Sequence, residues 1–222
     1  MKFEQKISCI IPAFNEAKNI GRVLGVLEKI GWIDEIVVVD DGSTDQTAQV
    51  ANSFKISNFR VISHDRNLGK GAAMATGIRA TKYDLVFFID SDLVGLEESH
   101  ILKILAPIIF TKEADLCLGV FALKKLNYNT TTKVANRMFP AITGQRAVWR
   151  NLLPPLSQIE RSRYGVDLLI TKNIPRRHRA VVKLNNLAQV KKEQKSDIVI
   201  NVVKARIKMY QEISKAMNSN DY

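Results

Sequence analysis

The stretch Leu85-Val86-Phe87-Phe88-Ile89-Asp90-Ser91-Asp92 decides how the rest of the chain is interpreted. Its five apolar residues predict a buried central strand, and two carboxylates follow that strand directly. Residues at i and i+2 point the same way in extended backbone, so Asp90 and Asp92 can converge on one hard cation such as Mg²⁺ or Mn²⁺. The alternative is that Asp90 caps a following helix and Asp92 is solvated, because an Asp-x-Asp triplet is common by chance.

The composition is that of an ordinary globular chain. It has 222 residues, 46% of them hydrophobic, which is enough for one good core. Cys9 and Cys117 each fall inside a predicted strand, so we expect buried, reduced thiols in a cytoplasmic protein. The polar residues 1–6 do not resemble a signal peptide, and no segment reaches the roughly 20 apolar residues of a membrane span.

The net charge of +11 is unevenly distributed. Residues 1–111 hold 12 basic and 14 acidic residues, a net charge of −2, whereas residues 112–222 hold 21 and 8, a net charge of +13. A basic second half suits an anionic partner: nucleic acid, an anionic membrane surface or a phosphorylated substrate.

Strands and helices alternate along the first half. Apolar strands are predicted at 7–11, where Pro12 ends the strand, and at 36–39, 59–63 and 85–89. Four helices are predicted to alternate with these strands. The first begins at about residue 15, the second ends at about 54, the third ends at about 80, and the fourth runs from after 97 to about 110. A further strand follows at 114–120. Apolar strands that alternate with helices predict a mostly parallel sheet covered on both faces.

Polar loops follow the first four strands, and they all lie at the carboxyl edge of that sheet, where ligands bind in open α/β sheets. These loops are 12–16, 40–45, 66–70 and 90–92. Four polar segments at one edge favour the functional interpretation of Asp90 and Asp92 over chance.

The second half has weaker periodicity. We expect a loop at 123–133, short helices at 134–139, 145–153 and 161–170, and a strand at 180–184. Apolar residues at helical spacing over 198–217 predict a basic amphipathic C-terminal helix, which either packs on the core or lies in a membrane interface.

Four motifs together resemble the family 2 glycosyltransferases of the GT-A fold, particularly the polyprenyl-phosphate sugar synthases. They are Ile10-Ile11-Pro12-Ala13-Phe14-Asn15-Glu16, Val39-Asp40-Asp41-Gly42-Ser43-Thr44-Asp45, Asn67-Leu68-Gly69-Lys70-Gly71-Ala72-Ala73 and Asp90-Ser91-Asp92. The resemblance covers roughly the first 120 residues. It implies an α/β, Rossmann-like three-layer sandwich, with one domain over 1–190 (1–120 binding the nucleotide sugar, 121–190 the acceptor) and the basic helix in 191–222.

The resemblance also implies a nucleotide-diphosphate sugar donor and a divalent metal, Mg²⁺ or Mn²⁺, on Asp90 and Asp92. Asp92 would act in catalysis, because the bound cation stabilises charge that develops on the leaving diphosphate. Lys70 either adds to this effect or is a solvated loop lysine. The residues implied in donor binding are Pro12, Ala13, Phe14, Asn15, Glu16, Asp40, Asp41, Lys70, Asp90 and Ser91.

For the acceptor, the segment 143–150 resembles a phosphate-acceptor region of the lipid-phosphate sugar synthases, with Gln145 where that pattern has an aromatic residue. Arg146 and Arg150 are four apart, so on a helix they would share one face and could bind a phosphate; a solvated basic face is the alternative. By resemblance, Asp167 is the candidate general base, needed only if the acceptor attacks through a hydroxyl. His178 would complete the metal shell, or lies in a solvated basic turn.

Three functions are compatible with these observations. The first is an inverting hexosyltransferase that acts on a polyprenyl phosphate at the inner membrane surface, as a peripheral membrane enzyme of cell-envelope synthesis. The second is a soluble transferase that acts on a phosphorylated small molecule or a glycan. The third is a non-catalytic nucleotide- or nucleic-acid-binding module, which we rank last because the chain has no nucleic-acid motif and this function leaves Asp90 and Asp92 unexplained.

Overall fold

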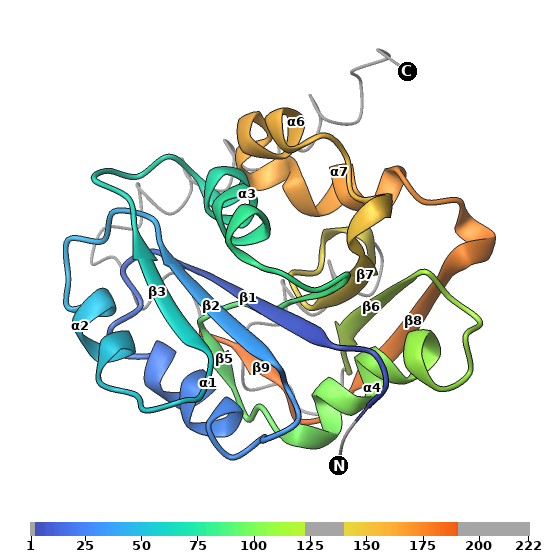
Figure 1. The fold of residues 1–222 in the computed structure, drawn as a ribbon, viewed down its shortest axis with the longest axis horizontal. Helices are drawn as coiled ribbons and strands as arrows, with labels where there is room; N and C mark the ends of the chain where they lie inside the picture. The colour runs from blue at the N-terminus through green and yellow to red at the C-terminus, as the bar shows by residue number, and fades with distance from the viewer. Residues whose placement is uncertain (1–2, 123–139, 191–222) are drawn as a thin grey trace.

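A computed structural model describes residues 3–122 and 140–190 of the chain (Figure 1). Its central sheet has seven strands in the order β3-β2-β1-β4-β7-β6-β8. The strands are β1 (Ile7–Ala13), β2 (Glu35–Asp40), β3 (Phe59–Ser63), β4 (Leu85–Phe88), β6 (Leu116–Phe121), β7 (Arg146–Trp149) and β8 (Arg179–Leu184). Only β7 runs against the others, pairing antiparallel with both β4 and β6. The expected mostly parallel sheet is confirmed.

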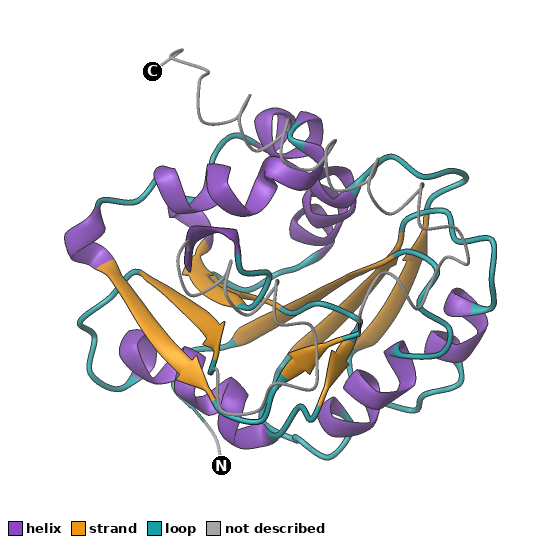
Figure 2. Ribbon diagram, turned by 180° about the vertical axis from the view of Figure 1, so that it is seen from behind, coloured by secondary structure: helices purple, strands orange, loops and turns teal. Residues whose placement is uncertain are grey.

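Helices cover both faces of the sheet, which gives the expected three-layer sandwich (Figures 1 and 2). One layer contains α1 (Ile20–Leu27), α2 (Thr47–Asn52) and α4 (Glu98–Ile109); the other contains α3 (Lys70–Ala80), α6 (Leu156–Arg161) and α7 (Val166–Lys172). Each face of the sheet forms a hydrophobic core with one helical layer, and alternate strand residues point into the two cores. Cys9 and Ile11 pack with the first layer, and Ile10 packs with the second. Strands β1, β2, β4 and β6 are therefore buried on both faces, whereas the edge strands β3 and β8 are partly exposed.

Short elements complete the fold. A two-stranded sheet joins β5 (Leu93–Val94) to β9 (Ala188–Gln189). The 3-10 turns are η1 (Pro140–Ile142), η2 (Arg150–Leu152), η3 (Arg163–Gly165) and η4 (Arg176–His178). Within the described ranges, no helix is long and apolar enough to cross a membrane.

Two predicted boundaries near the first loop are wrong by a few residues. Strand β1 continues through Pro12 to Ala13. Its pairing with β4 ends at Ile10, so at Pro12 no β4 carbonyl is left without a backbone N–H donor, and a proline is tolerated there. Helix α1 begins at Ile20 and not at 15, since a turn closed by the Glu16 carbonyl precedes it. The loop that follows β1 is consequently longer than predicted.

The helix predicted over 145–153 is wrong. Arg146–Trp149 forms β7, and η2 follows it. Ala147 pairs with Phe87 of β4 and with Cys117 of β6, so these residues fill a gap in the middle of the sheet. A short apolar run cannot be assigned to a strand or a helix by periodicity alone, and here the free strand edges decided the outcome.

Other expectations have mixed outcomes. Helical structure over 161–170 is present but divided between the end of α6, η3 and α7. The predicted loop at 123–133 and the helices at 134–139 and 198–217 lie outside the described residues. Cys9 and Cys117 are buried free thiols, as expected, and burial raises the pKa of Cys117 to about 12, which leaves it unreactive.

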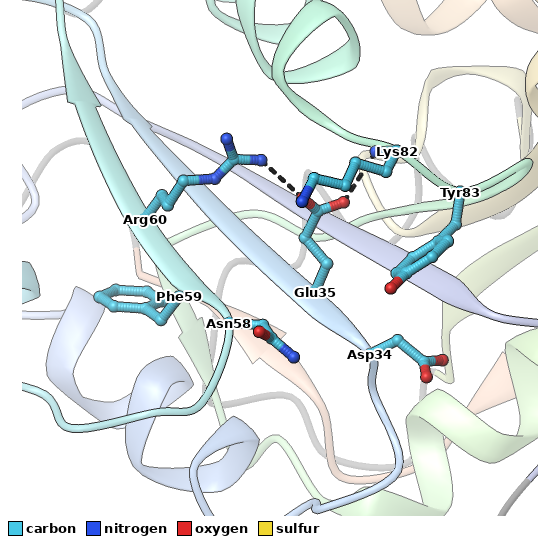
Figure 3. A pocket seen from close by; sticks show the side chains of 7 residues that line it. All are labelled: Asp34, Glu35, Asn58, Phe59, Arg60, Lys82 and Tyr83. Atoms are coloured by element: carbon cyan, nitrogen blue, oxygen red, sulfur yellow. Dashed lines mark hydrogen bonds and ion pairs between the residues drawn. The ribbon is translucent and has the colours of Figure 1, made fainter.

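A charged cluster that the sequence did not reveal lies at the amino ends of β1 and β2 (Figure 3). The buried Glu35 carboxylate accepts hydrogen bonds from Ser8 Oγ at 2.9 Å, Arg60 Nη2 at 2.5 Å and the Lys82 backbone N–H at 2.9 Å. These groups line a small cleft but satisfy one another. The cluster therefore fixes this edge of the sheet, and the carboxyl edge is left for function.

Candidate active site

The loops after β1 and β2 are joined into one platform. Asn15, in left-handed backbone at φ 55°, donates its N–H to Ser43 Oγ at 2.9 Å and accepts from the Thr44 N–H at 2.8 Å. The Glu16 N–H donates to Thr47 Oγ1 at 2.8 Å. Asparagine tolerates this backbone conformation better than most residues, which explains the residue type at position 15.

Phe14 is the exposed aromatic side chain of this platform, with 39% of its surface accessible, whereas the other exposed members, such as Thr44 and Asp45, are polar. By contrast, Ala13, Glu16 and Asp40 are buried. Glu16 accepts from Asn19 Nδ2 at 2.8 Å, and Asp40 accepts a short hydrogen bond from Ser43 Oγ. The ring of Phe14 is thus the part of the platform available for stacking against a flat ligand.

Asp41 anchors the loop that precedes α3. Its Oδ1 accepts from the Leu68 N–H at 3.0 Å, its Oδ2 accepts from the Gly69 N–H at 2.8 Å, and His64 Nδ1 lies 2.8 Å from Oδ1. The side chain is almost completely buried. The structure therefore places Asp41 as the support of the Lys70 loop.

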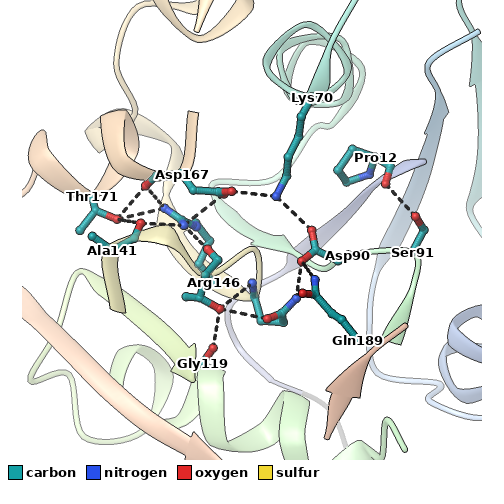
Figure 4. Close-up of polar contacts among 12 residues, drawn as sticks. Pro12, Lys70, Asp90, Ser91, Gly119, Ala141, Arg146, Asp167, Thr171 and Gln189 are labelled. Atoms are coloured by element: carbon teal, nitrogen blue, oxygen red, sulfur yellow. Dashed lines mark hydrogen bonds and ion pairs between the residues drawn. The ribbon is translucent and has the colours of Figure 1, made fainter. Parts of the chain in front are cut away.

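The centre of the site is a bridge made by Lys70 (Figure 4). Its Nζ donates to Asp90 Oδ1 at 3.0 Å and to Asp167 Oδ2 at 2.8 Å. Asp90 comes from the end of β4, and Asp167 from the first turn of α7. The structure thus brings together two acids separated by 77 positions in the sequence, through a lysine at the start of α3.

Two amides hold the other oxygen of Asp90. Gln145 Nε2 donates to Oδ2 at 2.7 Å, and Gln189 Nε2 donates to the same atom at 2.5 Å. Gly144 lies against this carboxylate, and a Cβ at that position would overlap both oxygens. The glycine before Gln145 is therefore required by the close approach of Asp90.

The charges in this cluster shift one another. Burial alone would raise the pKa of Asp90, but the charge of Lys70 and hydrogen bonds from Lys70 and Gln145 hold it below its ordinary value. Burial alone would lower the pKa of Lys70, but Asp167 and Asp90 together raise it. Because the pKa of Asp90 is lowered and that of Lys70 is raised, both of these groups are ionised at neutral pH.

Arg146 is fully buried and supports Asp167 from behind. Its Nη2 lies 3.1 Å from Asp167 Oδ1 and also donates to the Thr143 carbonyl, while Nη1 donates to the Asp167 carbonyl and to Thr171 Oγ1 at 3.1 Å. Burial lowers the pKa of this guanidinium, which nevertheless stays protonated in proteins. The expectation that Arg146 binds an acceptor phosphate on an exposed helical face is wrong.

Arg150 does not accompany Arg146 either. It lies after β7, at the opposite edge of the sheet from Asp90, and donates to the carbonyls of Ile78 at 2.7 Å and Thr81 at 2.9 Å. The two arginines are four apart on a strand and the turn that follows it, and not on a helix. The shared face predicted for them is absent, because 145–153 is not helical.

The metal-ligand role expected for His178 is also wrong. This residue precedes β8, and its Nδ1 pairs with Asp115 Oδ2 at 2.8 Å. Asp115 precedes β6, so the pair lies at the amino edge of the sheet, away from Asp90. Within the described ranges, no group of three His, Cys, Asp or Glu side chains is arranged to hold a metal.

Ser91 and Asp92 lie in the turn between β4 and β5. Ser91 Oγ donates to the Pro12 carbonyl at 3.1 Å, which ties this turn to the first loop. The Val190 N–H donates to the Asp92 carbonyl at 3.1 Å, and the Asp92 side chain is half-buried. Asp90 and Asp92 supply hard oxygen ligands of the kind that Mg²⁺ and Mn²⁺ prefer, so the donor set fits such an ion.

Sequence reasoning missed three residues of this site: Gln189, Thr143 and Thr171. Thr143 Oγ1 donates to the Gly119 carbonyl at 2.6 Å and lies 2.9 Å from Gln145 Oε1, so it orients that amide. Gln189 reaches Asp90 from 99 positions away, on a strand of two residues. No local pattern in the sequence marks such a residue.

Replacing Lys70 with Met should leave the buried Asp90 without its ion-pair partner and Asp167 with Arg146 alone. We expect a loss of about 3–5 kcal/mol in the free energy of unfolding at pH 7, measured by urea denaturation. Because the folded pKa of Asp90 is lowered, its stabilising contribution exists above the ordinary carboxyl pKa and is lost as pH falls. The pKa of Lys70 is raised, so its stabilising contribution is lost only in strong alkali.

The difference between wild type and Lys70→Met should therefore shrink below about pH 4. Lys103→Met, at an exposed position of α4, is the matched control and should change stability little. If Lys70→Met lowers the free energy of unfolding no more than the control does, the bridge is contradicted. It is also contradicted if the decrease is equally large at pH 7 and in acid.

Comparisons with known proteins agree with the fold. The family profile "Glycosyl transferase family 2" matches residues 8–166. Glucosyl-3-phosphoglycerate synthase from Mycolicibacterium smegmatis is 30% identical over 129 residues, which are 54% of this chain and 42% of that protein. Dolichyl-phosphate beta-glucosyltransferase ALG5C from Trichomonas vaginalis is 32% identical over 37% of this chain and 28% of that protein.

A solved structure of glucosyl-3-phosphoglycerate synthase from Mycobacterium tuberculosis, in complex with Mn²⁺, uridine diphosphate and glucosyl-3-phosphoglycerate, has a TM-score of 0.73. The alignment covers 97% of this chain and 80% of that one at 23% identity, a likeness that shows the fold. The chain spans less than half the length of both curated relatives. Because the family profile covers most of the chain, including β1 to β4 and the acid pair, the protein belongs to glycosyl transferase family 2.

Proposed function

We propose that this protein transfers a sugar from a nucleotide-diphosphate sugar to an anionic acceptor with the help of a divalent metal. One observation carries the proposal: Lys70 bridges the acid at the end of β4 to the acid at the start of α7. A donor bound over Asp90 and an acceptor bound near Asp167 would therefore meet at one point. Family membership supports this assignment, as do the complexes of the solved relative with Mn²⁺ and uridine diphosphate.

On the donor side, the exposed ring of Phe14 would stack against the base, and Asn15, Glu16 and Asp40 would shape the platform beneath it. Asp92 and Asp90 would hold Mg²⁺ or Mn²⁺, which supplies positive charge to the leaving diphosphate. Asp90 already accepts three donors, so Lys70 would have to share or leave it. Lys70 is then placed to contact the diphosphate itself.

On the acceptor side, the role of Asp167 depends on the attacking atom. Both of its oxygens lie beside cations, Oδ2 with Lys70 and Oδ1 with Arg146. A hydroxyl acceptor would need Lys70 to release Asp167 so that it can take the proton. A phosphate oxygen is already ionised and needs no such step.

Asp92→Asn should lower metal-dependent transfer roughly 100-fold or more, because the charge that stabilises the leaving diphosphate is lost. Transfer from UDP-glucose to 3-phosphoglycerate or to a short-chain polyprenyl phosphate, each with Mn²⁺, measures this directly. NMR of the product tests inversion, which we expect for direct displacement by the acceptor oxygen.

Asp65→Asn, at an exposed acid in the loop before α3, is the matched control and should retain full activity. Transfer that survives both Asp92→Asn and chelation of the metal contradicts the assignment of the acid pair.

A lipid-phosphate acceptor is the second candidate, favoured by the net charge of +13 over residues 112–222. With this acceptor, the protein would bind peripherally to the inner membrane surface. The two free thiols suit the reducing cytoplasm on that side of the membrane. The full-length chain should then float with anionic liposomes at low salt and be released at high salt. Failure to float at low salt leaves the soluble phosphorylated acceptor as the substrate class.

A further inference from the structure

Arg163 lies on the short segment that delivers Asp167 to the site. It begins η3, the 3-10 turn between α6 and α7, and stands four positions before Asp167. With Arg146 buried and Arg150 at the opposite edge of the sheet, the cation for an acceptor anion has to come from another residue. Arg163 is at the correct edge, because it packs on the start of α3.

The contacts of Arg163 place it beside the Lys70 loop. A Cβ built on Gly69 would lie 3.4 Å from Arg163 Nε and 3.5 Å from its Cβ and Cγ, so the side chain runs along that glycine. A Cβ on Gly71 would lie 2.9 Å from the Arg163 backbone N. The residues on both sides of Lys70 thus contact Arg163, while Lys70 itself reaches Asp167.

The backbone of Arg163 is in the left-handed region, with φ 48°. Such a conformation is uncommon for residues other than glycine, asparagine and aspartate, and it is found often at ligand-binding positions. Arg163 lies between α6 and α7, and the structure around it holds its backbone in this unfavourable conformation. The fold therefore keeps a guanidinium where glycine would be easier to accommodate.

The guanidinium of Arg163 also has no acidic partner among the described residues. The side chain is exposed, and within the described part of the chain it forms no ion pair. Its neighbour Arg161 differs, because Arg161 Nε donates to the Ser157 carbonyl at 3.1 Å. Tyr164, exposed at 39%, follows Arg163 in the sequence, and Leu68, exposed at 40%, precedes the Gly69 that Arg163 contacts.

We infer that Arg163 binds the phosphate of the acceptor and makes the enzyme specific for phosphorylated acceptors. This inference rests on the proposed transferase function and deepens it. A guanidinium offers paired N–H donors that match phosphate oxygens, and here it would hold the acceptor beside Lys70 and Asp167. The donor diphosphate, in contrast, binds over Asp90, on the other side of the Lys70 bridge.

The test measures KM for acceptor and donor separately in Arg163→Asn and Arg163→Lys. Asparagine tolerates the left-handed backbone, so Arg163→Asn removes the guanidinium without straining η3. We expect KM for the phosphorylated acceptor to rise about 10- to 100-fold, as for the loss of a charge-assisted hydrogen bond, with KM for UDP-glucose unchanged. Arg163→Lys should recover part of the loss, and Arg161→Asn is the matched control.

The acceptor probes are 3-phosphoglycerate, glycerol 3-phosphate and a short-chain polyprenyl phosphate, each compared with its dephosphorylated form. An unchanged acceptor KM in Arg163→Asn overturns the inference and leaves the transferase function intact. A rise in the UDP-glucose KM alone also overturns it, by assigning the guanidinium to the donor. A wild-type chain that turns over UDP-glucose with none of the three acceptors removes the acceptor class, and the inference with it. A chain that neither binds nor turns over UDP-glucose or any other nucleotide-diphosphate sugar contradicts the proposed function itself.

Discussion

The ion pair network through Lys70 is the constraint on which the site depends. Two carboxylates from distant parts of the chain, Asp90 and Asp167, lie mostly out of water and share one ammonium group. Burying carboxylates without a cationic partner carries a large desolvation cost. The position of Lys70 is set in turn by Asp41, which holds the two N–H groups just before it. The platform, the end of β4 and the start of α7 are therefore linked through one side chain.

This arrangement gives each half of the site a defined electrostatic role. Asp90 carries a full negative charge that three donors stabilise, and the absence of a side chain at Gly144 leaves room for this carboxylate. Asp167 is held between Lys70 and the buried Arg146, which also donates to the backbone carbonyls of Thr143 and Asp167. If Lys70 turns toward a bound diphosphate, both acids lose a partner at once. In the proposed function, binding of the donor would thereby be coupled to the freedom of Asp167, through a lysine placed to contact both.

The sequence predicted the first half of this fold well for physical reasons that are local. The buried β-branched strands, the helix over 70–80 and the shared edge of four polar loops follow from periodicity and from the geometry of parallel sheets. The acid pair was found because Asp90 and Asp92 stand at the end of the clearest strand. Recognition of the family rested on these same loops, and its profile match confirms it.

The second half was harder because its structure is decided by tertiary contacts. Arg146 was expected on a helix, but its neighbours fill a gap between β4 and β6, which no local pattern reveals. His178 was expected near Asp90, yet the direction of β8 places it at the opposite edge. Gln189 contacts Asp90 across 99 positions. These errors share one cause: pairing between distant strands is absent from short-range sequence signals.

The central claim is that Asp90 and Asp92 form the floor of a metal and diphosphate site. A crystal structure of the protein with Mn²⁺ and UDP, phased to show the anomalous scattering of manganese, tests it most directly. We expect one anomalous peak at direct coordination distance from the Asp92 carboxylate, adjacent to Asp90 and to the diphosphate, with the base against Phe14. A nucleotide bound elsewhere, or a manganese peak that neither aspartate contacts, would contradict it.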